Sequence, residues 1–231
     1  MNSLGNHYRA LVIGSTGTIG QAFVQALEQD PNCSRVIGLS RRSHPGFTLE
    51  SEASIAEAAA SLREEGPLDL IIDATGALTI DGQGPEKHMG ALQAERLSRA
   101  FEVNAIGPIL LLKHFSPLLN QSRSVFAKLS ARVGSISDNQ KGGWYGYRAA
   151  KAALNMLLQT AAIEIHRRRP DAIIAAMQPG TVASPLSQAF VAGHSTITAQ
   201  ESAQGLLNAL DTLTPRAGAH FIDFKGNEIP W

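Results

Sequence analysis

The sequence is short of several features that would point away from an ordinary globular protein. Of its 231 residues only Cys33 is a cysteine, so no disulfide can form within the chain and we expect a reducing compartment. The longest candidate apolar run, Ile109 to Leu112, ends at Lys113 and is far too short to span a bilayer. Residues 1–9 lack the apolar core of a signal peptide. We therefore expect a cytoplasmic protein without a membrane segment.

An excess of charge of one sign is also absent. Twenty basic and twenty acidic side chains cancel, so no overall field favours nucleic acid or an anionic membrane. The histidines are scattered, and neither Cys-x-x-Cys nor His-Glu-x-x-His occurs, so we expect no metal site. No Gly-x-Ser-x-Gly motif is present, which argues against a hydrolase.

Short apolar runs alternate with amphipathic segments along the whole chain. Strands are expected at 11–13, 36–39, 68–72, 125–129, 173–177 and 220–224. Helices are expected from the glycine-rich segment to residue 29 and at 54–65, 93–119, 147–168 and 200–213. This alternation predicts an α/β fold, a doubly wound parallel sheet with helices on both faces. Without an evident linker or repeat, residues 1–231 are expected to form one Rossmann-type domain.

A glycine-rich segment lies between the first expected strand and the first helix. It reads Gly14, Ser15, Thr16, Gly17, Thr18, Ile19 and Gly20. Glycines let the backbone approach a pyrophosphate closely, and the N-terminus of the following helix offers free N–H donors. The spacing of the glycines differs from the usual Rossmann fingerprint. The position of the segment between a strand and a helix nevertheless favours a dinucleotide site over a plain turn.

The end of the second expected strand bears on the choice of cofactor. An acidic residue at this point binds the adenosine ribose of NAD, but here Leu39 is followed by Ser40, Arg41 and Arg42. Two arginines offer hydrogen bonds to a 2′-phosphate. We therefore expect NADP(H) to be preferred over NAD(H), with exposed loop arginines that bind no ligand as the alternative.

Tyr147 and Lys151 are four residues apart in an expected helix and therefore share one face. A free tyrosine has a pKa of about 10, and a nearby ammonium lowers that pKa by favouring the phenolate. The pair can thus act as an acid/base group near neutral pH. The helix also carries an apolar stripe, interpreted as core: Ala150, Leu154, Leu157, Ala161 and Ile165. Because the polar pair borders this stripe, we expect it at the edge of a cleft.

Taken in order, these features resemble the short-chain dehydrogenase/reductase family over essentially the whole chain. The matching motifs are Gly14-x-x-Gly17-x-x-Gly20, Asp73-Ala74-Thr75-Gly76, Asn104, Ser130, Tyr147-x-x-x-Lys151 and Pro179-Gly180-Thr181. Segments 130–139 and 142–148 and the closing Ile229-Pro230-Trp231 are similar to the C-factor-like branch of that family.

The resemblance implies a seven-stranded sheet in the order 3-2-1-4-5-6-7 and a catalytic tetrad of Asn104, Ser130, Tyr147 and Lys151. In that scheme Tyr147 exchanges a proton with a carbonyl or alcohol. Lys151 lowers the pKa of Tyr147 and holds the nicotinamide ribose, and Asn104 positions a water. The resemblance also implies a homo-oligomer, a dimer or tetramer, formed through the two long helices.

Two positions depart from the family pattern. The family usually ends a strand with two serines, of which the second is catalytic, whereas this chain has Ser130-Ala131. Ser130 is the favoured replacement; Ser135, or no such donor, are the alternatives. The family's Asn-Asn-Ala-Gly is here Asp73-Ala74-Thr75-Gly76. Ala74, Thr75 and Gly76 stay expected cofactor contacts, although the side chains differ.

Pro108 supports a role for Asn104 independently of the family. Proline has no N–H to donate to the carbonyl of the residue four positions earlier, so the carbonyl of Asn104 is free to hold water if the helix continues with a kink. A helix that ends near Gly107 is the alternative.

The segment after the expected strand at 173–177 is a further candidate for ligand contacts. Ligands bind at the carboxyl ends of strands in such sheets, so the backbone of Pro179, Gly180, Thr181 and Val182 is expected to face the nicotinamide. Residues 181–198 mix glycine and proline with Leu186, Phe190 and Val191. This composition suits a lid over an apolar substrate, or an ordinary surface loop.

Three functions are compatible with these patterns. The first is an NADP(H)-dependent oxidoreductase, working as a carbonyl reductase on a small-molecule carbonyl or alcohol. The second is a signalling or regulatory protein of C-factor type that binds NAD(P)(H) with weak or no turnover. The third, a sugar-nucleotide epimerase or dehydratase, requires a separate substrate domain that we do not expect here. The Tyr147–Lys151 pair favours the first.

Overall fold

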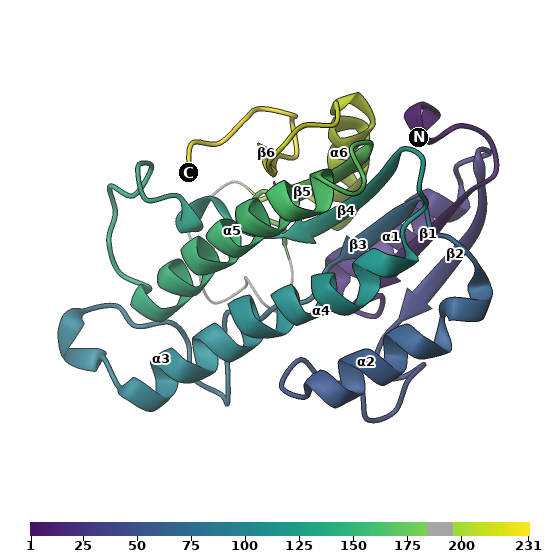
Figure 1. Cartoon of the computed structure of the whole chain (residues 1–231). Helices are drawn as coiled ribbons and strands as arrows, with labels where there is room; N and C mark the ends of the chain where they lie inside the picture. Colours follow the sequence, from purple (N-terminus) through teal and green to yellow (C-terminus); the bar gives the residue numbers. More distant parts are fainter. Residues whose placement is uncertain (184–195) are drawn as a thin grey trace.

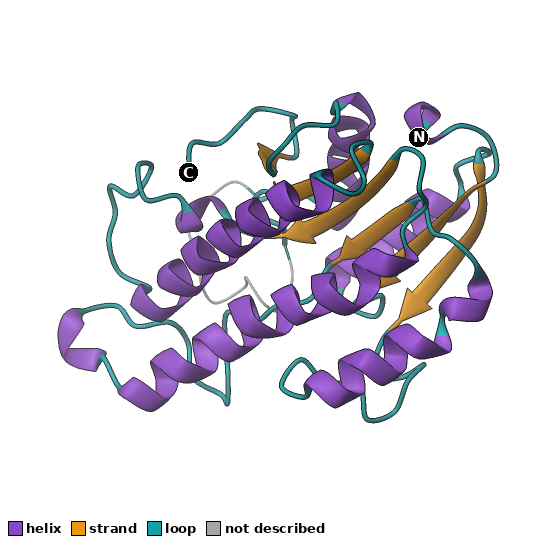
Figure 2. Ribbon diagram, in the orientation of Figure 1, coloured by secondary structure: helices purple, strands orange, loops and turns teal. Residues whose placement is uncertain are grey.

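The sheet of this protein is parallel throughout, as seen in a computed structural model that describes residues 1–183 and 196–231 (Figures 1 and 2). Within these residues its strands follow the order β2-β1-β3-β4-β5-β6. Their bounds are β1 Tyr8–Ile13, β2 Cys33–Leu39, β3 Leu70–Asp73, β4 Ser124–Leu129, β5 Ala172–Gln178 and β6 His220–Asp223. From β1 the strand order continues towards β2 on one side and towards β3, β4, β5 and β6 on the other. The predicted doubly wound class is therefore confirmed.

Helices cover both faces of the sheet (Figure 1). Helices α2, α4 and α5 pack on one face, and α1 and α6 pack on the other. Helix α3 packs against α5. The bounds are α1 Thr18–Glu28, α2 Glu52–Ser61, α3 Ala94–Phe101, α4 Gly107–Phe115, α5 Tyr145–His166 and α6 Ala199–Thr212. No helix in the described ranges is long and apolar enough to cross a membrane.

The predicted seventh strand is wrong for the described residues, which form six strands. The missing strand would lie outside β2. Only the twelve residues 40–51 separate β2 from α2. A parallel crossover alone takes a dozen or more residues, usually with a helix, so none remain for a further strand. Pro45 and Gly46, which has φ 93°, interrupt this segment. Phe47 and Leu49 instead pack on the core beneath α2, so β2 is the edge strand.

The helical stretch predicted at 93–119 is continuous through Pro108, so the alternative of a helix ending near Gly107 is wrong. Between α3 and α4 the chain forms a π-helical turn, η4, Glu102–Ile106. The N–H of Gly107 donates to the carbonyl of Glu102, five residues earlier. The wider turn lets the helix continue although Pro108 has no N–H to donate to the residue four positions earlier. It also places Asn104, which is fully buried, in the widened turn.

Gly20 is the point of closest approach between α1 and the loop after β1. A Cβ built on Gly20 would lie 2.1 Å from the carbonyl oxygen of Gly14, a distance that no real contact reaches. At Gly17 the corresponding distance is 3.4 Å, an ordinary contact. Glycine is therefore required at 20 for packing, whereas at 17 the backbone leaves room for a side chain.

We predict that Gly20→Ala lowers the free energy of unfolding by about 1–3 kcal/mol, because the added methyl group overpacks a backbone contact. Gly17→Ala, the matched control, should cost less than about 1 kcal/mol. Urea denaturation of both variants measures the difference. Equal stability of the two variants would show that α1 shifts to accept the methyl group.

Candidate active site

The loop after β1 has the backbone form expected of a phosphate site. Gly14 adopts φ 80°, and the N–H of Gly17 donates to the Gly14 carbonyl across a distance of 3.0 Å. Helix α1 begins at Thr18 with Gly17 as its N-cap, and no side chain caps it. The first N–H groups of α1 are thus left for an anion, with the positive end of the helix dipole behind them.

This loop forms one wall of a groove of about 460 Å³ at the carboxyl edge of the sheet. The groove gathers many of the sequence-predicted cofactor residues from three separate loops: Gly14, Thr16, Gly17, Ser40, Arg41, Ala74, Thr75 and Gly76. Other predicted residues of these loops do not line it: Ser15, Thr18, Ile19, Gly20 and Arg42. Ser15 instead donates to the carbonyl of Leu39, 3.3 Å away.

The turn after β2 separates the two arginines. Ser40 is buried, and its hydroxyl accepts from the N–H groups of Arg42 and Ser43. This turn leaves Arg41 on the groove wall while Arg42 lies off it. Among the described residues neither guanidinium has an ion-pair partner. Arg41 can therefore offer its donors to an anionic ligand in the groove.

Asn104 acts through its side chain on the loop after β3. Its Nδ2 donates to the carbonyl of Ala77 at 2.9 Å, and its Oδ1 accepts from the N–H of Ala77 at 3.0 Å. A Cβ on Gly76 would lie 3.1 Å from Asn104 Oδ1 and 3.5 Å from Lys151 Nζ. The paired amide thus holds Gly76 close beside Lys151.

Tyr147 and Lys151 lie on one face at the start of α5, as predicted. The Lys151 Nζ is 5.6 Å from the centroid of the Tyr147 ring and donates to the carbonyl of Leu129, at the end of β4, over 3.1 Å. Lys151 is 2% exposed. Burial lowers the pKa of its ammonium well below the usual 10.5; the like charge of Lys128 adds to this shift and Asp73 opposes it. Burial raises the pKa of the Tyr147 hydroxyl to about 12.

Both candidate serines use their hydroxyls in contacts within the protein. The Ser130 hydroxyl donates to Asn155 Oδ1 of α5 at 2.7 Å, and both residues are buried. The Ser135 hydroxyl, also buried, accepts from the N–H of Asp138 at 3.1 Å. At the family's usual position stands Ala131, which has no hydroxyl.

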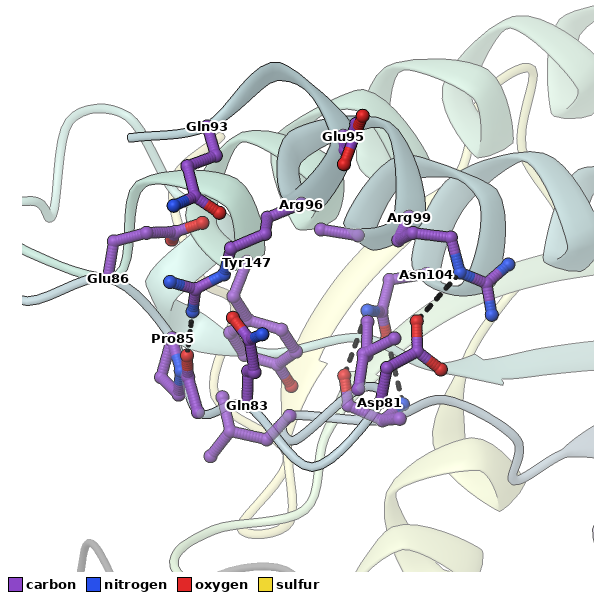
Figure 3. A pocket seen from close by; sticks show the side chains of 15 residues that line it. Asp81, Gln83, Pro85, Glu86, Gln93, Glu95, Arg96, Arg99, Asn104 and Tyr147 are labelled. Carbon is purple, nitrogen blue, oxygen red and sulfur yellow. Dashed lines mark hydrogen bonds and ion pairs between the residues drawn. The ribbon is translucent and has the colours of Figure 1, made fainter. Parts of the chain in front are cut away.

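A second pocket, of about 220 Å³, lies beside Tyr147 and adjoins the groove (Figure 3). Ala77, Ile80, Asp81 and Arg99 line both cavities. The remainder of its wall is largely polar: Gln83, Glu86, Gln93, Glu95, Arg96 and Asn104. The wall of this pocket is thus polar, whereas the sequence led us to expect an apolar lid at 181–198. Most of that segment lies outside the described residues.

Arg99 was not identified from the sequence. From α3 its guanidinium forms ion pairs with Asp81 at 3.1 Å, Glu50 at 3.2 Å and Glu102. These carboxylates come from three different segments, so Arg99 joins the loop after β3 to the segment before α2. Only the pair with Glu102 has a local i,i+3 spacing, and no such spacing signals the pairs with Glu50 and Asp81, which are distant in sequence.

The segment after β5 lies at the same edge of the sheet. Gly180 adopts φ 80°, and a Cβ on it would meet Ile197 and Phe224 at 2.9 and 3.0 Å. The carbonyl of Pro179 accepts from the Ser202 hydroxyl, and Val182 forms a bridge with Ile197. Pro179, Gly180, Thr181 and Val182 line neither of the two cavities above within the described ranges.

Comparisons with known proteins identify relatives of this chain. The family profile for short chain dehydrogenase matches residues 45–195. The chain is 33% identical over 190 residues to the 1-hydroxy-2-glutathionyl-2-methyl-3-butene dehydrogenase of Rhodococcus sp. (strain AD45), which covers 81% of this chain and 79% of the relative. It is 31% identical over 169 residues to the C-signal protein of Myxococcus xanthus, covering 72% of this chain and 94% of that one.

Solved structures share the fold at lower identity. A short-chain dehydrogenase/reductase from Burkholderia multivorans with bound NADP matches with a TM-score of 0.83 and 20% identity, over 97% of this chain and 100% of that one. The NADPH-bound carbonyl reductase from chicken fatty liver also matches with a TM-score of 0.83, at 24% identity, over 98% and 95% of the two chains.

Proposed function

The chain belongs to the short-chain dehydrogenase family of NAD(P)-dependent oxidoreductases, and we propose that it is an NADP(H)-dependent carbonyl reductase with Tyr147 as its acid/base group. The observation that carries this proposal is the place of Tyr147 and Lys151 between two adjoining cavities. Tyr147 lines the polar pocket, and Lys151 lies beside Gly76, which lines the groove.

Three features of the groove support a dinucleotide as its ligand. The form of Gly14 and the uncapped start of α1 leave room and N–H donors for a pyrophosphate, and Arg41 offers donors to a 2′-phosphate. Gly76 lines the groove beside Lys151, and on this proposal the nicotinamide end of the cofactor lies there. When bound, a nicotinamide cofactor supplies or accepts the hydride.

The residues of the chain provide the proton. In a reduction, the Tyr147 hydroxyl donates its proton to the carbonyl oxygen, and in an oxidation the phenolate takes it back. A pKa of about 12 is too high for rapid exchange near neutral pH. The ammonium of Lys151 must therefore be charged when Tyr147 reacts, because its positive charge favours the phenolate.

The second candidate function is a regulatory protein that binds NAD(P)(H) with weak or no turnover. It is favoured by Ala131, which leaves no hydroxyl at the usual position of the catalytic serine. Incubation of the purified protein with NADPH and a panel of aldehydes, ketones and quinones separates the two functions.

We predict that Tyr147→Phe abolishes turnover with any member of this panel, while NADPH binding is retained. The substitution removes only the hydroxyl, and general acid/base groups contribute about 10² to 10⁴ in rate. Initial rates and NADPH fluorescence titration of wild type and variant measure the two effects. A variant with a near-normal kcat would rule out this mechanism.

The serine substitutions give a separate prediction. We propose Ser130 as the second donor to the substrate oxygen, a role in which its hydroxyl turns from Asn155. Ser130→Ala should then lower kcat/KM by roughly two- to tenfold, the value of one hydrogen bond, and Ser135→Ala should change it little. The reverse pattern would make Ser135 the donor. If neither variant changes kcat/KM, Tyr147 binds the substrate oxygen without a serine.

Cofactor preference is predicted to depend on Arg41. The protein should bind NADPH about ten- to a hundredfold more tightly than NADH, since hydrogen bonds to a charged group contribute roughly 1.5 to 3 kcal/mol. Exposure to salt moves this preference towards the lower value. Arg41→Ala should remove most of it and leave NADH affinity unchanged. Arg42→Ala is the matched control, because Arg42 does not line the groove.

Fluorescence titration of both cofactors against the three proteins measures this preference. Equal affinity of the wild type for NADPH and NADH would contradict the NADP(H) assignment. A preference that Arg42→Ala removes and Arg41→Ala does not would assign the 2′-phosphate to the other arginine.

A further inference from the structure

Lys128 is an unexpected residue in the centre of the sheet. It lies in β4, directly beside Asp73 of β3 in the parallel register, and both side chains are 0% exposed. The Lys128 Nζ is 3.0 Å from Asp73 Oδ1. It also donates to the carbonyl and hydroxyl oxygens of Thr75, at 2.6 and 3.1 Å. A cation in a strand whose only other polar residue is Ser124 is thus bound by Asp73, at the end of β3, and by Thr75 in the loop that follows.

Such a pair is not explained by stability. Withdrawing two charges from water costs free energy that their mutual attraction often fails to recover, so apolar residues in their place are commonly as stable. The pair is also incompletely satisfied, since Asp73 Oδ2 is buried without a hydrogen-bond partner among the described residues. Its retention points to a role in the site above it.

Lys128 and Asp73 together hold the loop at Thr75, because Asp73 Oδ1 also accepts from the N–H and the hydroxyl of Thr75. Asn104 holds the loop two residues further along, at Ala77. Gly76 lies between these two attachment points, close to Lys151 Nζ. Thr75, Gly76 and Ala77 all line the groove. Lys128 is therefore placed to set the position of this part of the groove wall relative to Lys151.

The charge of Lys128 acts on the same residue. It lowers the pKa of the Lys151 ammonium as a like charge, in addition to the effect of burial, while Asp73 opposes the shift. Burial also lowers the pKa of Lys128 itself, and Asp73 counters that shift. The carboxylate of Asp73 is paired with Lys128, and its charge also acts on the pKa of Lys151.

Resting on the proposed function, we propose that Lys128, together with Asp73, is a positioning residue for Lys151: it holds the Thr75–Ala77 loop in the cofactor groove, and its buried positive charge sets the upper pH limit of activity. Neither residue touches the substrate. Both act through the loop and through Lys151.

The charged groups packed around α5 have partners other than Lys151. The buried carboxylate of Glu86 accepts from the N–H of Gly146 at the start of α5, and Arg148 of α5 donates to the carbonyls of Gly142 and Gly143. Tyr147, on the same helix, is the group that reacts. The remaining cations have the following partners: Arg132 of η6 (Arg132–Gly134) with Asp138 and Asp223, Arg99 of α3 with Glu50, Asp81 and Glu102, Arg96 of α3 with the carbonyl of Gly84, and Lys113 and His114 of α4 with Glu52. Glu95 of α3 is exposed, and β5 contributes no charged side chain.

The test compares Lys128→Met with Lys128→Arg, and uses Lys113→Met as a surface lysine control. On the proposed mechanism, reduction should slow at alkaline pH as Lys151 loses its proton. Lys128→Met removes the like charge and leaves the carboxylate of Asp73, which raises the pKa of Lys151. The alkaline limb of the kcat profile should then move upward by about one pH unit. Lys128→Arg keeps the charge, so its limb should stay at the wild-type position, as should that of Lys113→Met.

NADPH titration by fluorescence provides a readout that does not depend on turnover. Lys128→Met should weaken NADPH binding roughly tenfold, because Thr75 loses its charged donor, whereas Lys113→Met should not change it. If the wild type reduces no carbonyl in the panel, the proposed function fails, and this titration alone decides the role of Lys128 in holding the loop.

If Lys128→Met does not fold, because it leaves Asp73 unpaired, the double variant Asp73→Asn/Lys128→Met removes both charges and takes its place in the titration. The same roughly tenfold loss of NADPH affinity is expected. Wild-type NADPH affinity in the folded variant, or an alkaline limb that Lys128→Met and Lys128→Arg leave at the same pH, would overturn the proposal.

Discussion

The parallel pairing of β1 with β3, and of β3 with β4, is the constraint on which the rest of this structure depends. Parallel strands end at the same edge of the sheet, so loops that are distant in sequence meet there. A Cβ on Gly14 would lie 3.2 Å from the backbone carbon of Ala74. The groove between these loops exists because both strands stop at the same level, and no contact within either loop produces it.

The same register brings charges together inside the protein. Asp73 and Lys128 are opposite each other at the ends of neighbouring strands, and Lys151 contacts the carbonyl of Leu129, the residue after Lys128. In a low-dielectric interior such groups influence one another more strongly than they would in water. Burial also raises the pKa of the Tyr147 hydroxyl, so the start of α5 shares a buried, charged environment with the ends of β3 and β4.

The two cavities are formed mainly by different segments of the chain. The groove is formed by the ends of β1, β2 and β3, whereas the pocket is formed by the loop after β3, by α3 and by Tyr147. Arg99 lies in the wall that they share and is bound to carboxylates from three segments. The two cavities thus share part of one wall, which includes Ala77 of the loop that Asn104 holds.

The sequence by itself determined the features that depend on neighbours along the chain. The glycine loop between a strand and a helix and the shared face of Tyr147 and Lys151 follow from local periodicity and backbone sterics, whereas the continuation of the helix through Pro108 was left open and needed the structure. Only the tertiary structure decided which strands exist at the edge of the sheet and that Arg41, not Arg42, lines the groove. It also decided that Ser130 donates to Asn155 and Lys128 to Thr75. These choices depend on strand register and on the packing of distant segments, which a pattern along one chain does not contain.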